Sequence, residues 1–220
     1  MSVSKTPLLV FDWDGTLMDS ISHIVDSLQY AMRETGIEVL GRERSSSIIG
    51  LGMREAIEAL FPEQANDERF VRDYTRYYRD YYLDPARSTR LFPGVREMLT
   101  EFKEQGYTLA VATGKGRQGL DHVLQQTGLG ALFSASRCAG ETRSKPHPEM
   151  LQTILADTGF HRDQAIMIGD TEYDLEMASN AKVVSVGVSY GAHNEQQLIA
   201  HKPIAIIHKI TELPELLQSQ

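Results

Sequence analysis

The sequence predicts an α/β protein in which a parallel β-sheet is flanked by helices and an all-helical segment follows the first strand. Short apolar runs end abruptly at polar residues, as strands buried on both faces do. Helical patterns lie between these runs, and such alternation is typical of parallel sheets with right-handed crossovers. Residues 18–90 differ, because they carry helical patterns and no convincing buried strand.

Four short apolar runs predict the strands of the sheet. The first run, residues 7–11, stops at Asp12. The others behave alike and cover residues 107–112, 165–168 and 183–186. Apolar residues between and beside these runs recur with helical spacing. This spacing predicts helices over residues 94–105, 116–126, 146–158 and 171–180.

The segment after the first strand is predicted to form a separate helical module. Its helical patterns cover residues 20–34, 53–60 and 67–83. Pro93-Gly94 marks the return to the sheet. The predicted domains are therefore an α/β core of residues 1–16 and 91–220 and an all-helical cap of residues 17–90. One face of the last cap helix carries a stripe that we interpret as core between helices: Tyr74, Tyr77, Tyr78, Tyr81 and Tyr82.

Composition narrows the class of protein. Hydrophobic residues make up 41% of the 220 residues and charged residues 24%, which is typical of a soluble globular protein. The net charge of −8 argues against a nucleic-acid partner. The apolar run before Asp12 is too short for a signal-peptide core or a membrane span, so a cytoplasmic protein without a membrane partner is expected. The single cysteine, Cys138, is expected to be a buried small residue.

Chemically active side chains follow the predicted strands. Ligands of open parallel sheets bind beyond the carboxyl ends of the strands, so these groups should converge. Carboxylates packed together repel unless a cation lies between them, and a hard divalent ion such as Mg²⁺ suits oxygen ligands beside a phosphate. The pattern therefore predicts a phosphoryl-transfer site. The converging groups are Asp12, Asp14, Thr113, Lys115, Lys145, Asp170 and Asp174.

Four motifs in this order resemble those of the haloacid dehalogenase superfamily, and more narrowly its phosphatases of the phosphoglycolate phosphatase type with a helical cap. They are FDWDGTLMDS, ATGK, SKPHPE and IGDTEYD. The resemblance covers essentially the whole chain and implies a Rossmann-like core. It also implies a Mg²⁺-dependent phosphatase that hydrolyses a small phosphomonoester through an aspartyl-phosphate intermediate.

The resemblance implies roles for the matched residues. Asp12 is the nucleophile and a metal ligand, and Asp14 is the general acid and base, with a backbone carbonyl that resembles a metal ligand. Lys145 keeps Asp12 ionised and neutralises the transferring phosphoryl group, while Asp170 ligates the metal. The remaining matched positions are Thr113 and Gly114, which bind a phosphate oxygen; Asp174, which resembles a second-shell or water-mediated ligand; and Lys115, which shapes the loop or lies near its mouth.

Some residues have competing interpretations. Asp174 could serve only as a first-turn carboxylate favoured by the helix dipole. His147 is expected to be a first-turn polar residue, and His23 faces either the cleft or solvent. Residues 50–54 resemble the family's cap loop, so Arg54 either contacts the substrate or is an ordinary surface arginine.

The main competing motif is the glycine run from Gly114 to Gly119. It matches a dinucleotide-binding fingerprint, and Glu141 follows at a suitable spacing. This alternative, an oxidoreductase, leaves Asp12, Lys145 and Asp170 unexplained.

Within the superfamily, a phosphatase is predicted. Asp14 argues against a dehalogenase, which needs no acid for a halide. No lysine lies between Thr16 and Phe92, which argues against a phosphonatase that forms an imine with a cap lysine. A sugar phosphomutase and a pyrophosphatase or nucleotidase stay open, and intact site residues argue against a non-catalytic binding protein. The expected partner is a small phosphorylated metabolite, and the chain is expected to be a monomer or homodimer.

Overall fold

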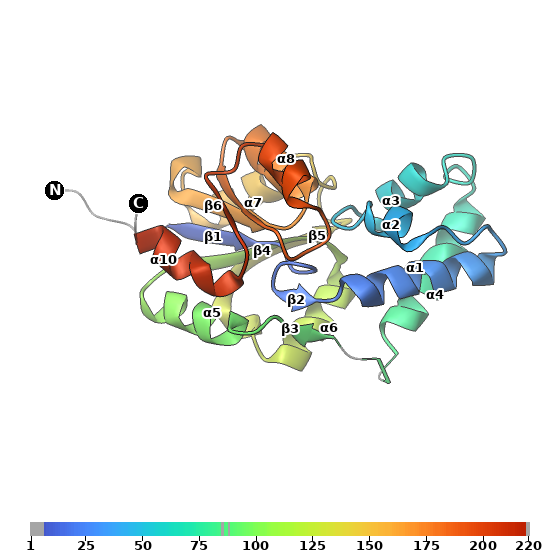
Figure 1. Cartoon of the computed structure of the whole chain (residues 1–220), viewed down its shortest axis with the longest axis horizontal. Coiled ribbons are helices and arrows are strands. Elements are labelled where there is room, and N and C mark those ends of the chain that lie inside the picture. The colour runs from blue at the N-terminus through green and yellow to red at the C-terminus, as the bar shows by residue number, and fades with distance from the viewer. Residues whose placement is uncertain (1–6, 85, 88, 219–220) are drawn as a thin grey trace.

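A six-stranded parallel sheet forms the centre of the larger part of the chain in the computed structural model, which describes residues 7–84, 86–87 and 89–218 (Figure 1). The strand order is β5-β4-β1-β6-β7-β8. β1 is central and wholly buried, and its Val10 pairs with Ala110 on one side and Met167 on the other. The strands are β1 (Leu8–Phe11), β4 (Thr108–Gly116), β5 (Phe133–Ala139), β6 (Ala165–Gly169), β7 (Val184–Val188) and β8 (Ala205–Ile207).

Helices cover both faces of this sheet (Figure 1). Successive strand residues point to opposite faces, so Leu9 and Phe11 join one apolar cluster while Leu8 and Val10 join another. Helices α5, α6 and α10 pack on the first face, and α7 and α8 on the second. Their bounds, with that of α9 near β8, are α5 (Val95–Glu104), α6 (Arg117–Thr127), α7 (Glu149–Thr158), α8 (Glu172–Ala181), α9 (Glu195–Ala200) and α10 (Leu213–Gln218).

The α/β prediction is confirmed, and the differences lie at particular elements. β4 extends to Gly116, past the predicted end of its strand. β5 and β8 are absent from the predicted strands. β5, at the edge of the sheet, has the mixed sequence FSASRCA and is mostly half-buried, so it lacks a continuous apolar run. α7 begins at Glu149 rather than at residue 146, with Pro148 as its N-cap.

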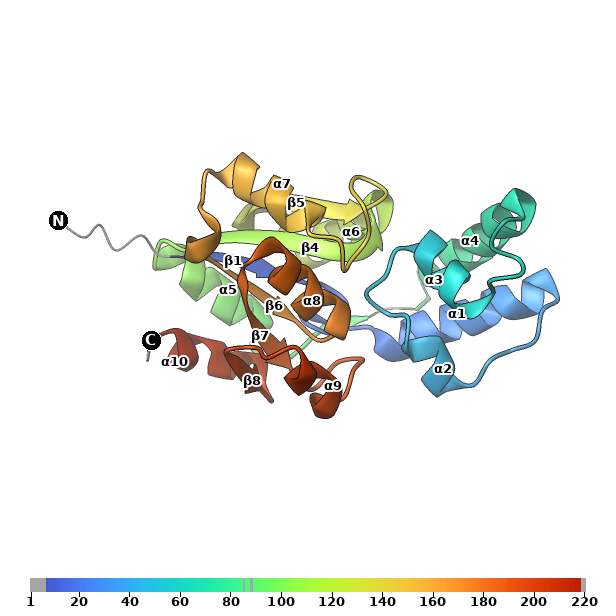
Figure 2. The same ribbon diagram turned by 90° about the horizontal axis from the view of Figure 1, so that it is seen from above.

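The helical segment forms its own apolar cluster beside the sheet (Figure 2). Tyr74 is buried in that cluster, and its hydroxyl donates to the Leu28 carbonyl at 3.2 Å. Asp67 caps the last helix by accepting from the Arg69 and Phe70 amides. The elements are α1 (Ile21–Thr35), α2 (Arg42–Ser46), α3 (Met53–Leu60) and α4 (Glu68–Tyr82).

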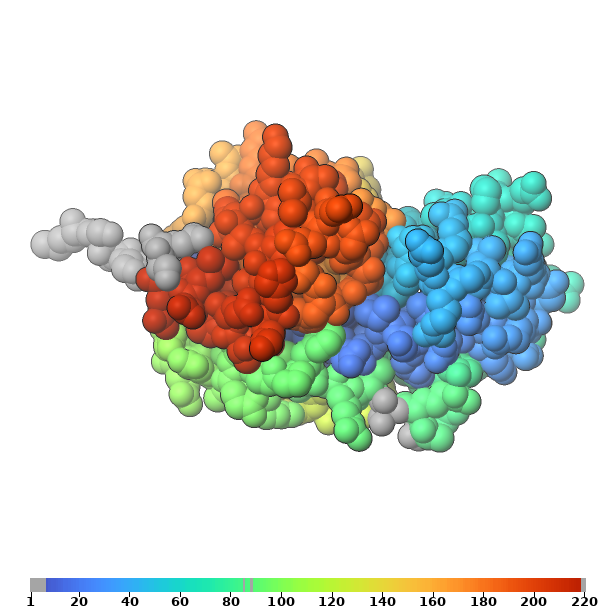
Figure 3. All heavy atoms as spheres, viewed as in Figure 1, coloured from blue at the N-terminus to red at the C-terminus, as the bar shows by residue number. Residues whose placement is uncertain are grey.

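Two short strands lie where the chain leaves and re-enters the sheet part. β2 (Met18–Asp19) pairs antiparallel with β3 (Arg90–Leu91). The space-filling view shows the cap, in blue to cyan, lying directly against the orange atoms of the larger part of the chain (Figure 3). The domain division at 16/17 and 90/91 stays a prediction.

Only some tyrosines of the predicted stripe on α4 belong to the core between the helices. The core interpretation holds for Tyr74 and is incomplete for Tyr78 and Tyr82, because both also line a cavity between cap and sheet. Tyr81 instead lies 4.9 Å from the Tyr30 ring and beneath the Arg87 guanidinium.

Two other sequence features have structural outcomes. Cys138 is fully buried as expected, and that burial raises the pKa of its thiol to about 12. Among the described residues, no helix has the length and apolar character needed to cross a membrane.

Candidate active site

The loop after β1 carries the first two carboxylates. The Asp12 amide donates to the Ile168 carbonyl at 2.9 Å, which holds Asp12 at the carboxyl end of the sheet beside β6. Gly15 has a φ of 85°, and a Cβ there would lie 2.2 Å from Asp170 Oδ2. Only glycine suits this position, because it tolerates the left-handed conformation and lets the loop approach Asp170.

Lys145 joins two of the carboxylates. Its Nζ lies 2.7 Å from Asp12 Oδ1 and 2.6 Å from Asp174 Oδ1, and all three side chains are at most 2% exposed. Burial by itself would lower the pKa of Lys145, but Asp12 and Asp174 outweigh it and hold that pKa above its usual value. Lys145 is therefore a fixed positive charge in the site.

Three carboxylates lie close enough to share a cation. Asp12, Asp170 and Asp174 each offer an oxygen within 4.8 Å of the others. Burial raises the pKa of Asp12 to about 7, with Lys145 opposing the shift and Asp174 adding to it. Burial, with Asp12 and Asp174 nearby, also raises the pKa of Asp170 well above its usual value. The cluster thus disfavours three negative charges unless a cation compensates them.

The free lone pairs of this cluster fit a metal ion. Asp12 Oδ2 is buried and has no hydrogen-bond partner among the described residues. Asp170 accepts one bond at each oxygen, from the Thr16 hydroxyl at 2.9 Å and the Ala192 amide at 2.8 Å, so each oxygen keeps a lone pair. These are oxygen donors, which Mg²⁺ prefers.

The Asp174 carboxylate accepts more hydrogen bonds than the Asp170 carboxylate. Its Oδ1 accepts from Lys145, and its Oδ2 accepts from both the amide and the hydroxyl of Thr171. The first-turn interpretation of Asp174 is therefore incomplete, because this carboxylate also positions Lys145.

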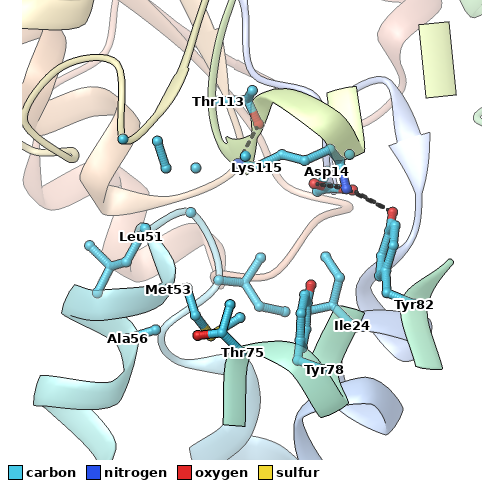
Figure 4. Close-up of a pocket in the computed structure, with 18 of the residues that line it drawn as sticks. Asp14, Ile24, Leu51, Met53, Ala56, Thr75, Tyr78, Tyr82, Thr113 and Lys115 are labelled. Carbon is cyan, nitrogen blue, oxygen red and sulfur yellow. Dashed lines mark hydrogen bonds and ion pairs between the residues drawn. The ribbon is translucent and has the colours of Figure 1, made fainter. Parts of the chain in front are cut away.

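The Asp14 side chain belongs to a different set of contacts, on the cap side of the loop. Its Oδ1 accepts from the Ser20 hydroxyl at 2.7 Å, and its Oδ2 lies 2.9 Å from Lys115 Nζ. The Lys115 ammonium also donates to the Tyr82 hydroxyl at 2.8 Å and lies 4.0 Å from that ring's centroid (Figure 4). Asp14 is thus held by groups from the loop, the sheet and the cap.

Lys115 contacts Asp14 directly, a contact that the sequence did not predict. Its side chain is 6% exposed and touches Asp14, whereas the expectation was a position shaping the loop or near its mouth. The contact from Tyr82 was also missed. Spacing alone cannot show which tyrosine of the helical stripe faces the sheet.

Thr113 and Gly114 lie where the β4 chain meets the cap. The Thr113 hydroxyl accepts from the Lys115 amide at 3.1 Å. A Cβ at Gly114 would lie 2.4 Å from the Gly50 carbonyl oxygen and 2.6 Å from that of Leu51. The Gly52 amide donates to the Ser144 hydroxyl at 2.8 Å, so the loop before α3 contacts both β4 and the segment before α7.

The other candidate residues lie apart from the carboxylates. Arg54 lines the edge of the cavity, is about half exposed and pairs with Glu68 at 2.5 Å. His23 Nε2 lies 3.0 Å from the Tyr82 carbonyl, so it supports the cap helix rather than facing solvent freely. His147 was expected in the first turn of a helix, but α7 begins at Glu149, so His147 lies just before the N-cap Pro148. Its Nδ1 accepts from the Glu149 amide at 3.3 Å.

Glu141, the acidic residue that the dinucleotide-binding interpretation requires, is already paired. Glu141 forms a two-point ion pair with Arg117, at 2.8 and 2.9 Å, instead of standing free for a ribose.

A cavity of about 550 Å³ lies between the sheet and the cap (Figure 4). Its sheet side includes Asp12, Asp14, Thr113 and Lys115. Figure 4 shows Leu51, Met53 and Tyr78 on the opposite side.

Comparison with known proteins identifies the family of this chain. The family described as haloacid dehalogenase-like hydrolase matches residues 9–188. A Dickeya dadantii protein named "Probable phosphatase IndB" is 36% identical, over 94% of this chain and 91% of that protein. A phosphoglycolate phosphatase of Agrobacterium fabrum is 29% identical, over 96% and 92% of the two chains.

A solved structure has the same fold and extent. It is described as a predicted phosphoglycolate phosphatase from Haemophilus somnus, and it superposes with a TM-score of 0.85 at 25% identity. The match covers 98% of this chain and all of the other.

Proposed function

This chain belongs to the haloacid dehalogenase-like hydrolase family, and we propose that it is a Mg²⁺-dependent phosphatase that hydrolyses a phosphomonoester through an aspartyl-phosphate at Asp12. One observation carries the proposal. Asp12 lies buried at the end of β1 with one oxygen on Lys145 and the other without a partner among the described residues. A buried, charge-compensated carboxylate with an open oxygen is suited to covalent catalysis.

The reaction takes two steps. An Asp12 oxygen bonds to phosphorus as the bond from phosphorus to the ester oxygen breaks, and Asp14 gives its proton to the departing alcohol. Asp14, now a carboxylate, takes a proton from the water that attacks the aspartyl-phosphate. Inorganic phosphate leaves and the Asp12 carboxylate is restored. Ser20 and Lys115 hold Asp14 in orientation during both steps.

The remaining groups bind and neutralise the phosphoryl group. Lys145 compensates its charge from a position fixed by Asp174. The Thr113 hydroxyl already accepts from Lys115, so its own hydrogen can be donated to a phosphate oxygen, together with the Gly114 amide. Asp12, Asp170 and the Asp14 backbone carbonyl would hold Mg²⁺, which when bound supplies charge neutralisation for the phosphoryl oxygens.

The cap completes the site. Its loop and the Tyr82 hydroxyl touch the sheet part around Lys115 and Gly114, which reduces the access of solvent to the site while the cap is in this position. We infer a small phosphorylated metabolite as substrate. A cytoplasmic location and a monomeric or homodimeric state stay predictions.

The first test is hydrolysis of p-nitrophenyl phosphate by the purified chain, with Mg²⁺ and with excess chelator. We expect metal-dependent turnover that falls below a few per cent in Asp12→Asn. The matched control is Asp19→Asn, an exposed carboxylate in the same motif, which should keep wild-type activity. If Asp12→Asn were as active as the control, Asp12 would not be the nucleophile.

A second variant tests the role of Asp14, which acts in both steps. Asp14→Asn should slow hydrolysis at least about 100-fold, because proton transfer by a positioned side chain contributes about 10²–10⁴ in rate. Rapid quench with a ³²P-labelled ester measures any trapped phosphoenzyme. An unchanged rate would remove the acid and base role from Asp14.

A further inference from the structure

The cavity between sheet and cap is larger than a phosphoryl group and a two-carbon leaving group require. Its 550 Å³ equals the liquid volume of roughly 18 water molecules, at about 30 Å³ each. Cavities of about 300–1,000 Å³ enclose ligands of drug size. The part of the cavity beyond Asp14 is therefore available to a larger leaving group.

The cap side of this space is largely apolar. Ile24, Leu28 and Ile49 line it and are nearly fully buried, and the half-buried Met53 lines it beside them. Thr75 also lines it, but its hydroxyl is already donated to the Val71 carbonyl at 2.7 Å. An apolar leaving group would gain from removing these surfaces from water.

Charges around the cavity do not favour a carboxylate on the leaving group. Lys115 contacts Asp14 and Tyr82, and Arg54 pairs with Glu68. Arg117 also lines the cavity and forms a two-point ion pair with Glu141. Glu55 lines the cavity at the start of α3 and would repel an anion. Arg79 also lines the cavity, but it is exposed, so a carboxylate could meet it only at the solvent edge.

Tyr78 adds one polar group to this apolar wall. Its ring stacks on Tyr82 with centroids 5.8 Å apart and planes 19° apart, and Tyr82 is itself held by Lys115. No hydrogen bond of the Tyr78 hydroxyl is found among the described residues, and Figure 4 shows this hydroxyl directed toward the side of Asp14 and Lys115. The hydroxyl is therefore free to bond a leaving group.

We propose, resting on the phosphatase function above, that the substrate is a phosphomonoester whose leaving group has a ring-sized, uncharged body. That body lies against Ile24, Met53 and Tyr78, and one of its polar groups bonds the Tyr78 hydroxyl. Tyr78 is then a specificity-determining residue. On this proposal, the chain prefers such a substrate to a two-carbon ester that carries a carboxylate, such as phosphoglycolate.

The experiment compares esters of alkyl alcohols, so that the chemistry of bond cleavage varies little. The esters are ethyl phosphate, phosphoglycolate, 2-phenylethyl phosphate and the three 2-(hydroxyphenyl)ethyl phosphates. We expect kcat/KM for 2-phenylethyl phosphate to exceed that for phosphoglycolate by at least about tenfold, within the range that an apolar pocket can discriminate. At least one hydroxyphenyl isomer should exceed the phenyl parent further.

Two variants test the assigned contacts. Tyr78→Phe should remove the advantage of the hydroxyphenyl isomer while keeping the preference for a ring. Met53→Trp should fill the cavity and lower the ratio of 2-phenylethyl to ethyl phosphate by about tenfold. Tyr77→Phe, on the same helix but outside the cavity lining, should leave all ratios unchanged. Thermal unfolding of each variant checks that it is folded.

The outcomes are separable. Phosphoglycolate or ethyl phosphate hydrolysed as well as the ring esters would overturn the inference and leave the phosphatase function intact. If neither Tyr78→Phe nor Met53→Trp changes the ratios of kcat/KM between the esters, the assigned contacts are wrong. No Asp12-dependent turnover of any ester, p-nitrophenyl phosphate included, would overturn the phosphatase function itself.

Discussion

The charge balance around Asp12 depends on Lys145. This lysine is fully buried between Asp12 and Asp174, so it cannot be replaced by solvent. Breaking a buried ion pair leaves an uncompensated charge, which costs about 3–5 kcal/mol. One residue therefore contributes both to folding and to the proposed chemistry.

We predict that Lys145→Met lowers kcat at least about 100-fold, as the loss of one electrostatic group at a reacting centre does. It should also reduce the free energy of unfolding by a few kcal/mol at neutral pH. Steady-state kinetics and urea unfolding measure the two effects. The exposed Lys103→Met is the control and should change neither. A Lys145→Met enzyme within tenfold of wild type would contradict the role assigned to this ammonium.

The sequence predicts these residues unequally. Asp12, Asp14 and Asp170 were found because each follows an apolar strand, and parallel strands end at one edge of the sheet. The contacts of Lys115 with Asp14 and Tyr82 were not found. Lys115 and Tyr82 belong to different parts of the chain, and their contact depends on where the cap rests.

At the scale of elements, the close approach of the cap loop to β4 controls the site. Gly114 meets the carbonyl oxygens of Gly50 and Leu51, with no room for a Cβ. Gly116, two residues later in the same strand, has open space around its Cβ position and a φ of −70°. The two glycines therefore form a matched pair.

We predict that Gly114→Ala reduces kcat/KM at least about tenfold, because the cap loop must move away from the phosphate-binding residues. Gly116→Ala should have a small effect, since Cβ meets nothing there. Kinetics on p-nitrophenyl phosphate compare the pair, and limited proteolysis reports opening of the loop at residues 47–52. Equal losses in both variants would mean that loop contact does not control activity.

Strong periodicity also decided which elements could be predicted. Cap helix α3 was predicted with its observed bounds, since its apolar residues recur with helical spacing. β5 could not be recognised, because an edge strand with Ser134, Ser136 and Arg137 lacks the apolar run of a buried one. Its place in the sheet depends on pairing with β4, a tertiary contact.

At the scale of the whole molecule, folding gathers carboxylates that repel one another in the metal-free protein. Burial raises the pKa of Asp12 to about 7 and that of Asp170 well above its usual value. In the unfolded chain both ionise near the ordinary Asp value of 3.8. Between that pH and about 7, the folded protein binds more protons than the unfolded chain. Metal-free stability contributed by these groups is therefore lost as pH rises through this window.

A bound divalent cation should reverse this loss. We predict that saturating Mg²⁺ raises Tm more at pH 8 than at pH 5.5, because protons compete with the ion for Asp12 and Asp170. A ligand at 100 times its Kd adds about 2.7 kcal/mol, or about 5–10 °C for a chain of this size. Differential scanning fluorimetry with Mg²⁺ or chelator measures the shift. Asp170→Asn should lose it, whereas the exposed Asp163→Asn should keep it. A shift that is larger at pH 5.5, or equal in Asp170→Asn and Asp163→Asn, would mean that these carboxylates do not hold the metal.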